Sequence, residues 1–299
     1  MSADAHGNLG GKHLVVFGCG YVGTEVARQA LARGADVTAL TRNDSKAAIL
    51  RAAGLKTIAA DLASDSWHGQ IEGGVDFVLN CVSSGGAGIE GYRRSYVEGM
   101  ASLLKWARTS GAVDTIVYTS STSVYPQGDG ACVDEFAAAD GAGERAQLLL
   151  AAEELLRASE GACARWFILR LAGIYGPDRA HLIEQVRAGQ VSGRGEHRLN
   201  LAHRDDIAAA VWAAFGAPAS VRNEIFNVAD DGAAPKATII AWLAAKLGVP
   251  LPRFTGEPTV GRRSVTPDRV IVNDKIKKTL SWQPRYPTFR EGYEKILSR

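Results

Sequence analysis

A turn with three glycines near the amino terminus has the spacing G-x-G-x-x-G, which is typical of phosphate binding. In this pattern the glycines permit a tight turn, the approach of a diphosphate to the backbone, and close packing of a helix on a strand. The apolar run 13–17 before the turn predicts a strand, and the amphipathic run 22–33 after it predicts a helix whose first N–H groups face an anion. The alternative is a glycine-rich turn that binds nothing, but the flanking strand and helix favour a dinucleotide. The expected cofactor contacts here are Gly18, Gly20, Tyr21, Val22 and Gly23.

The end of the next expected strand, 36–40, decides which dinucleotide suits the site. An acidic residue there would accept hydrogen bonds from the adenosine ribose, whereas Thr41-Arg42 offers a hydroxyl and a guanidinium that suit a 2′-phosphate. We therefore expect NADP(H) to be preferred, with NAD(H) possible; the alternative is that Arg42 is only a solvated residue at a strand end. Asp61 could accept from the adenine amino group or cap a helix. Further contacts are expected at the ends of the following strands, from Asp61, Leu62 and Val82.

The composition excludes several classes of protein. The 299 residues are 46% hydrophobic and 22% charged, with a net charge of +2, which gives no electrostatic reason to expect nucleic acid or an anionic membrane as partner. A small-molecule substrate is expected instead. The four cysteines form no C-x-x-C pair, which favours reduced thiols over disulfides or a metal site and indicates a cytoplasmic protein. The sequence shows neither the pattern of a secretory leader nor an apolar run of bilayer length.

Strands and helices alternate along the chain to about residue 170, which predicts an α/β fold with a parallel sheet and crossover helices. Beyond residue 177 the pattern becomes irregular, which predicts a smaller lobe interleaved with the sheet. The expected organisation is a flexible tail at 1–11, a dinucleotide-binding domain at 12–176 and a substrate lobe at 177–299, with about 200–229 returning to the first domain.

Five segments in order resemble one known family. The serine-rich strand end 117–125 is followed by segments at 168–177, 203–208, 224–230 and 280–292, and together they resemble the extended short-chain dehydrogenase/reductases, the NAD-dependent epimerase/dehydratase family. The resemblance implies a doubly wound, Rossmann-type parallel sheet that holds the cofactor and a smaller lobe that closes over a substrate, often a nucleotide sugar. It also implies a possible homodimer through helices near 89–110 and 144–159.

The chain departs from this family at the acid/base pair Tyr-x-x-x-Lys. The helix after the serine-rich strand has Arg145 at the tyrosine position and Leu149 at the lysine position, and no tyrosine in the sequence has a lysine four residues later. In this respect the chain resembles the atypical subgroup of the family. In the usual mechanism the lysine lowers the pKa of the tyrosine, so that a phenolate acts as base near neutrality. Reduction of a carbonyl is therefore easier to retain than oxidation of an alcohol.

The remaining polar residues of the motifs provide the candidates for catalysis and substrate binding. Ser121 stands at the family's serine position and could donate a hydrogen bond to a carbonyl, or only satisfy local backbone groups. Tyr125 and Tyr175 would flank the cleft, where a neutral phenol can donate a proton. His203 is expected to be structural rather than a general acid. Candidates for holding a substrate phosphate are Arg194, Arg198, Arg262 and Arg263.

Three functions follow from these features. The first is NADPH-dependent reduction of a carbonyl on a small molecule or nucleotide sugar. The second is a catalytically silent dinucleotide-binding protein that acts as a sensor or scaffold. The third and weakest is a nucleotide-sugar epimerase or dehydratase, whose cycle needs a base for its oxidation step.

Overall fold

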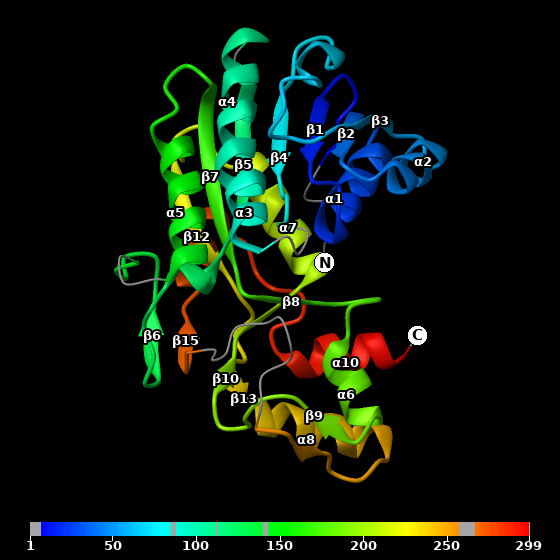
Figure 1. The fold of residues 1–299 in the computed structure, drawn as a ribbon, viewed down its shortest axis with the longest axis vertical. Helices are drawn as coiled ribbons and strands as arrows, with labels where there is room; N and C mark the ends of the chain where they lie inside the picture. The colour runs from blue at the N-terminus through cyan, green and yellow to red at the C-terminus, as the bar shows by residue number, and fades with distance from the viewer. Residues whose placement is uncertain (1–6, 85–87, 112, 140–142, 257–266, 299) are drawn as a thin grey trace.

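The computed structural model of the chain describes residues 7–84, 88–111, 113–139, 143–256 and 267–298. Its centre is a seven-stranded sheet in which every pair of neighbouring strands is parallel (Figure 1). In spatial order the strands are β12 (Glu224–Val228), β7 (Cys163–Leu171), β5 (Val113–Ser121), β4 (Phe77–Asn80), β1 (His13–Phe17), β2 (Asp36–Thr41) and β3 (Lys56–Ala59). The chain order reverses between β1 and β4, where ligands bind in open sheets of this kind.

Helices cover both faces of the sheet. One face carries α1 (Tyr21–Ala32), α2 (Asp44–Ala52) and α7 (Arg204–Phe215), and the other carries α4 (Gly99–Thr109) and α5 (Glu144–Arg157). The sequence of β1 is apolar without a break from Leu14 to Phe17 because both faces of the strand are buried. Leu14 and Val16 pack in one core, and Val15 and Phe17 pack in the other. The single helix expected at 89–110 is interrupted: α3 (Gly88–Tyr92) passes through a π-helical stretch, Arg93–Glu98, before α4 begins.

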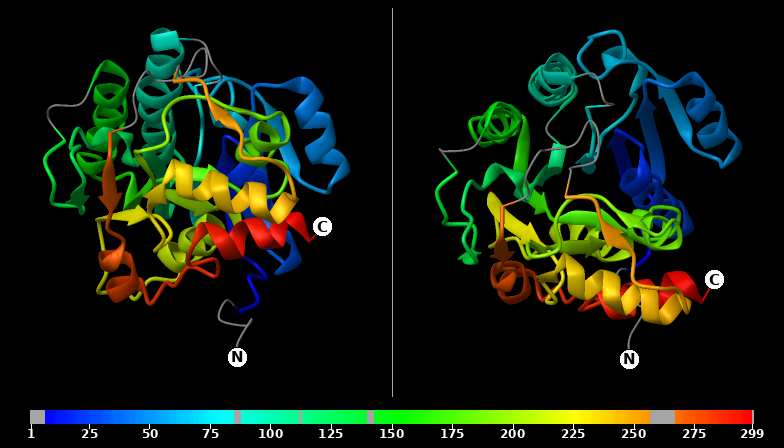
Figure 2. Two further views of the ribbon diagram at one scale, coloured as in Figure 1. Left: turned by 90° about the horizontal axis from the view of Figure 1, so that it is seen from below. Right: turned by 60° about the horizontal axis from the view of Figure 1, so that its bottom comes forward.

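While α7 and β12 return to the sheet, most of the chain after β7 builds the lobe below the carboxyl ends of the strands. Its helices α6 (His181–Arg187), α8 (Lys236–Leu247) and α10 (Phe289–Leu297) share a separate apolar core, and Figure 2 shows α8 and α10 side by side. A further helix is α9 (Asp274–Leu280), and the short strands, which form two-stranded pairs, are β6 (Ala131–Val133), β8 (Gly173–Tyr175), β9 (Gln190–Val191), β10 (Arg198–Leu199), β11 (Leu201–His203), β13 (Ala234–Pro235), β14 (Arg253–Phe254) and β15 (Arg269–Ile271).

The predicted α/β fold with a doubly wound parallel sheet is confirmed. Strand β12 follows lobe elements in the sequence and yet joins the edge of the sheet beside β7. The domain boundaries expected at residues 11 and 176 stay predictions. Within the described ranges, no helix combines the length and the apolar character needed to cross a membrane.

Candidate functional site

The glycine-rich turn connects β1 to α1, and a glycine suits each of its three positions for a different structural reason. Gly18 has a φ of +80°, and a Cβ there would lie 2.5 Å from the Cα of Val82. A Cβ at Gly23 would lie 2.7 Å from the Sγ of Cys81, because the helix packs closely on the sheet. At Gly20 the nearest atom to a Cβ would be the Gly18 carbonyl oxygen at 3.6 Å. The backbone face at Gly20 is therefore open, as the approach of a diphosphate requires.

The first turn of α1 is suited to an anion. Its N-cap residue is Gly20, which has no side chain to accept from the helix N–H groups, and the first turn contains no acidic residue. The positive end of the helix dipole is thus not balanced locally. Val22 is buried in the core, whereas the side chain of Tyr21 leaves the turn toward the lobe, where its hydroxyl donates to the carbonyl oxygen of Pro177 at 2.6 Å.

The end of β2 places a hydroxyl and a cation beside this turn. Thr41 is buried and its Oγ1 accepts from the backbone N–H of Asn43 at 3.4 Å, while the side chain of Arg42 is exposed. The sequence analysis missed Lys46, which stands half-buried in the first turn of α2. Burial raises the pKa of the Cys19 thiol in the glycine-rich turn, and the positive charge of Lys46 opposes this rise. Asn43 caps α2 by accepting from the N–H of Lys46, and this cap was the available sequence signal.

Asp61 stands after β3 and is already hydrogen-bonded within the protein. Its carboxylate accepts from the N–H of Ala63 at 2.9 Å and from Nε of Arg94 at 2.8 Å. Burial alone would raise the pKa of Asp61, but these two hydrogen bonds and the charges of Arg94 and Arg42 together outweigh it, and the pKa lies below the usual value. Leu62 is buried against Gly99. A contact of Asp61 with the adenine amino group stays a prediction, and a bound adenine would share the carboxylate with Arg94.

Ser121 is the last residue of β5 and is half-buried. Its Oγ accepts from the N–H of Ser123 at 3.1 Å and so caps the short 3-10 helix Thr122–Val124. An accepting hydroxyl still has its own proton to donate. Ser121 therefore satisfies a local backbone group, as one of the two expectations had it, and its hydroxyl proton remains able to polarise a carbonyl.

Tyr125, which was expected to flank the cleft, lies in the interior of the protein. It is buried, its hydroxyl donates to Oδ1 of Asn227 at 2.8 Å, and the same hydroxyl accepts from Nη1 of Arg170 at 2.9 Å. Arg170 also forms a buried ion pair with Glu153 at 2.6 Å, on the sheet-facing side of α5. Burial raises the pKa of Tyr125. The single proton of this phenol is already donated to Asn227, so proton donation to a substrate would break a hydrogen bond of this buried network.

Tyr175, also expected to flank the cleft, is buried as well. Only 3% of its surface is exposed, and its ring packs between those of His203 and Tyr293, with centroids 5.2 and 4.9 Å away. Burial raises the pKa of this phenol far above its usual value. The ring packs in the lobe core against Gly292 of α10, where any larger side chain would collide with it. His203 has the structural role expected of it, because its Nδ1 accepts from the backbone N–H of Asp205 at the start of α7.

The two positions of the family's acid/base pair contain unsuitable groups. Leu149 is buried in the apolar core, and the Arg145 guanidinium lies over the ring of Tyr92, 5.3 Å from its centroid. Neither position supplies a phenol or an ammonium. Within the described parts of the chain, no group of three or more His, Cys, Asp or Glu side chains is arranged to hold a metal ion.

Two of the four candidate phosphate-binding arginines lie in the described parts of the chain. Arg194 is exposed, whereas Arg198 is bound to Asp268 through an ion pair of 2.7 Å. Arg262 and Arg263 lie outside the described residues. A shared phosphate site for the four arginines stays a prediction.

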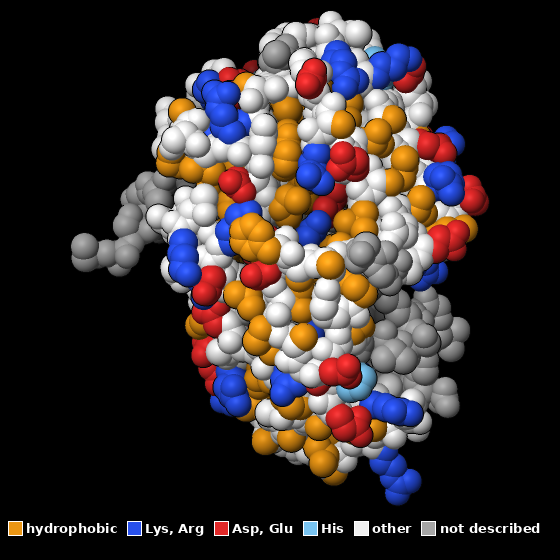
Figure 3. Space-filling view, turned by 90° about the vertical axis from the view of Figure 1, so that its left-hand side faces the viewer, with side chains coloured by type: hydrophobic (Ala, Val, Ile, Leu, Met, Phe, Trp, Pro, Cys, Tyr) orange, Lys and Arg blue, Asp and Glu red, His pale blue; other side chains and the backbone are white. Residues whose placement is uncertain are grey.

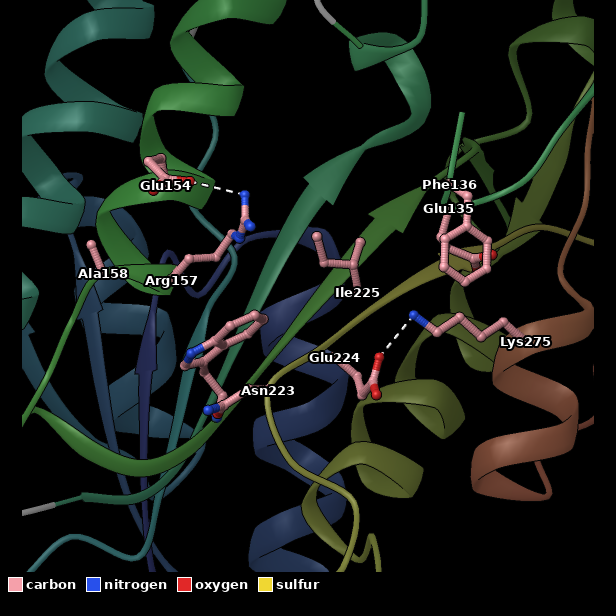
Figure 4. Close-up of a pocket in the computed structure, with 10 residues that line it drawn as sticks. Glu135, Phe136, Glu154, Arg157, Ala158, Asn223, Glu224, Ile225 and Lys275 are labelled. Atoms are coloured by element: carbon pink, nitrogen blue, oxygen red, sulfur yellow. Dashed lines mark hydrogen bonds and ion pairs between the residues drawn. The ribbon is translucent and has the colours of Figure 1, made fainter. Parts of the chain in front are cut away.

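A separate hollow of about 460 Å³ lies at the opposite edge of the sheet, beside β12. Figure 3 shows this side of the molecule, where apolar side chains are mixed with both signs of charge. In Figure 4 the ion pair of Glu154 and Arg157 on α5 faces that of Glu224 and Lys275, with Ile225 between them. Strands β7, β5 and β4 separate β12 from β1, so this hollow is not part of the glycine-rich site. Its cations are already paired.

Comparison with known proteins agrees with the motifs and the sheet. A family model described as the NAD dependent epimerase/dehydratase family matches residues 14–229. The chain belongs to this family. Among similar proteins, Protein YeeZ of Escherichia coli (strain K12) is 25% identical over 282 residues, which are 92% of this chain and 97% of YeeZ. A 3-diazoavenalumate denitrifying reductase of Streptomyces sp is 29% identical over 217 residues, 67% of this chain and 70% of that protein.

A solved structure of a functionally unknown conserved protein from Silicibacter pomeroyi DSS has the same fold as this epimerase/dehydratase family member. It is 26% identical in sequence, superimposes with a TM-score of 0.79, and the match covers 96% of this chain and 98% of that one. The match covers the lobe as well as the sheet, so the whole arrangement of elements is shared.

Proposed function

We propose that this family member is an NADPH-dependent reductase that acts on a carbonyl group of a small molecule or a nucleotide sugar. The observation that carries the proposal is the absence of a phenolate base. Arg145 and Leu149 stand where the tyrosine and lysine of the family would stand, and burial raises the pKa of Tyr125. Alcohol oxidation needs a group that has already lost its proton, whereas reduction needs only donors.

The residues around the turn fit a dinucleotide. The open backbone at Gly20 and the uncapped start of α1 would receive the diphosphate, and Thr41 with Arg42 would bind a 2′-phosphate. When bound, the cofactor supplies the hydride. The Ser121 hydroxyl would donate to the carbonyl oxygen, and water would deliver the proton. The Streptomyces relative, which is named a reductase, is consistent with chemistry in this direction.

The preference for NADPH over NADH is tested by titrating both into the protein and into Arg42→Ala. A charge-assisted contact with the 2′-phosphate contributes about 1.5–3 kcal/mol, so we expect a roughly ten- to hundredfold preference that the substitution largely removes. Arg187→Ala, which removes an exposed arginine from the end of α6, is the control and should change nothing. Equal affinities for the two cofactors in the unsubstituted protein would refute the preference.

The reaction itself is tested by following NADPH consumption with aldehydes, ketones and nucleotide keto-sugars. Ser121→Ala should slow turnover by about a hundredfold or more if Ser121 polarises the carbonyl, with little change in NADPH affinity. Alcohol oxidation should be slow near pH 7, because burial raises the pKa of the Tyr125 and Tyr175 phenols above the usual value of about 10 and neither forms a phenolate at neutral pH. Rapid oxidation at neutral pH would mean that a base has been missed.

A second candidate function is a catalytically silent dinucleotide-binding protein that acts as a sensor or scaffold. The burial of Tyr125 and Tyr175 favours it, because neither phenol lies where it can donate to a substrate. Tight NADPH binding without turnover of any carbonyl would support this function over the reductase. A nucleotide-sugar epimerase is the weaker reading, because its oxidation step needs the missing base.

A further inference from the structure

Tyr21 connects the cofactor helix to the lobe. It is the first residue of α1, directly after Gly20, and its hydroxyl donates to the carbonyl oxygen of Pro177, 156 residues away in the sequence. Gly176 packs closely against the phenol, since a Cβ there would lie 2.7 Å from the Tyr21 hydroxyl oxygen. The segment between β8 and α6 thus passes beside the start of α1 (Figure 1).

Two arginines lie over the Tyr21 ring. The guanidinium carbon of Arg204 is 5.3 Å from the ring centroid, and that of Arg179 is 5.5 Å away. The charge of Arg204 is balanced by Asp205 at 2.9 Å and by Glu25 at 3.9 Å. Arg179 belongs to the segment between β8 and α6, and its side chain places a positive charge beside Tyr21.

The contact between Tyr21 and Pro177 persists over the physiological pH range. Burial raises the pKa of Tyr21 to about 12, although the charges of Arg204 and Arg179 oppose this rise. The hydroxyl therefore keeps its proton and remains a hydrogen-bond donor to the carbonyl of Pro177. A neutral phenol also preserves the ring face on which a guanidinium can lie.

We propose that Arg179 is a diphosphate-binding residue of the dinucleotide site and that Tyr21, through Pro177, is the positioning residue that holds it there. The proposal rests on the proposed dinucleotide binding. The glycine-rich turn offers backbone N–H groups to the diphosphate but no charged side chain of its own. A guanidinium supplies the missing charge and two parallel donors for phosphate oxygens. Because Arg179 lies on the segment that leads into α6, a bound diphosphate also holds that segment against α1.

Calorimetric titration of the full-length protein with NADPH and with adenosine 2′-monophosphate, which lacks the diphosphate, tests the proposal. Arg179→Ala should weaken NADPH binding roughly ten- to hundredfold and leave the monophosphate unchanged, and Arg179→Lys should recover part of the loss. Arg187→Ala is the matched control. Tyr21→Phe keeps the ring but removes the hydroxyl, and it should weaken NADPH binding roughly three- to tenfold.

The positioning role of Tyr21 is separated from a merely structural one by the double variant. Tyr21→Phe should cause no further loss of NADPH affinity once Arg179 is alanine, because the hydroxyl then has no arginine to position. An equal loss in both backgrounds would overturn the positioning role. Unchanged NADPH affinity of a folded Arg179→Ala variant would overturn the proposal while the proposed function stands. An unsubstituted protein that binds neither NADPH nor NADH would overturn both.

Discussion

Asp230 makes the stability of this protein depend on pH. It follows β12 at the entry to the lobe, only 5% of its surface is exposed, and its Oδ1 accepts from the N–H of Gly232 at 3.1 Å. Its Oδ2 has no hydrogen-bond partner in the described part of the chain. Burial, opposed by the hydrogen bond from Gly232 but joined by the charges of nearby carboxylates, raises its pKa to about 8. These are Asp231, Asp206 and Glu291, and the phenols facing it are those of Tyr175 and Tyr293.

The sign of the effect follows from the two states of the carboxyl. Its pKa is about 8 in the folded protein and near the ordinary 3.8 when the chain is unfolded, so the folded state holds a proton that the unfolded chain releases. The stabilisation is complete below about pH 4 and is lost as the pH rises through 8. At 1.36 kcal/mol for each pH unit, the loss between pH 5 and pH 8 is about 4 kcal/mol.

Asp230→Asn should remove this loss, because the amide cannot ionise. We expect the free energy of unfolding of the variant, relative to the unsubstituted protein, to rise by about 4 kcal/mol between pH 5 and pH 8. Urea denaturation at a series of pH values measures it. Asp129→Asn, at an exposed position with a φ of +56° that asparagine tolerates, is the control and should follow the unsubstituted protein. If Asp230→Asn and the unsubstituted protein change in parallel, Asp230 is ionised in the folded protein and the reasoning is wrong.

The remaining predictions concern glycines and use matched pairs. Gly20→Ala should keep its melting temperature and lose NADPH affinity, whereas Gly23→Ala, with a Cβ 2.7 Å from a sulfur, should lose about 1–3 kcal/mol of stability. Equal effects of the two changes on melting would contradict the different surroundings of these glycines. Gly292→Ala would place a Cβ 1.9 Å from the hydroxyl oxygen of Tyr175 and should cost about 2 kcal/mol or more, while Gly143→Ala, with nothing within 4 Å, should be nearly neutral in thermal denaturation. A stable Gly292→Ala protein would mean that α10 does not pack on Tyr175.

Much of the fold could be predicted because it depends on neighbours in the sequence. The apolar run 13–17, the three glycines and the helix behind them specify a strand, a turn and a helix within about 20 residues. The same locality explains the prediction of a parallel sheet, since alternating strands and helices leave few other topologies. The loss of the acid/base pair at Arg145 and Leu149 was also visible in the sequence, because it is a matter of residue identity.

The sequence alone determined, then, that the chain has a glycine-rich turn on a doubly wound sheet without the family's base. Only the tertiary structure decided what the tyrosines do. Tyr125 meets Asn227 across 102 residues and Tyr21 meets Pro177 across 156, and no local pattern encodes such contacts. Whether a tyrosine next to a motif is exposed or buried depends on whether the fold places a guanidinium, a carbonyl or a glycine from a distant part of the sequence beside it. That choice depends on the packing of whole elements, and it places Tyr125 in a buried network and Tyr175 beneath α10.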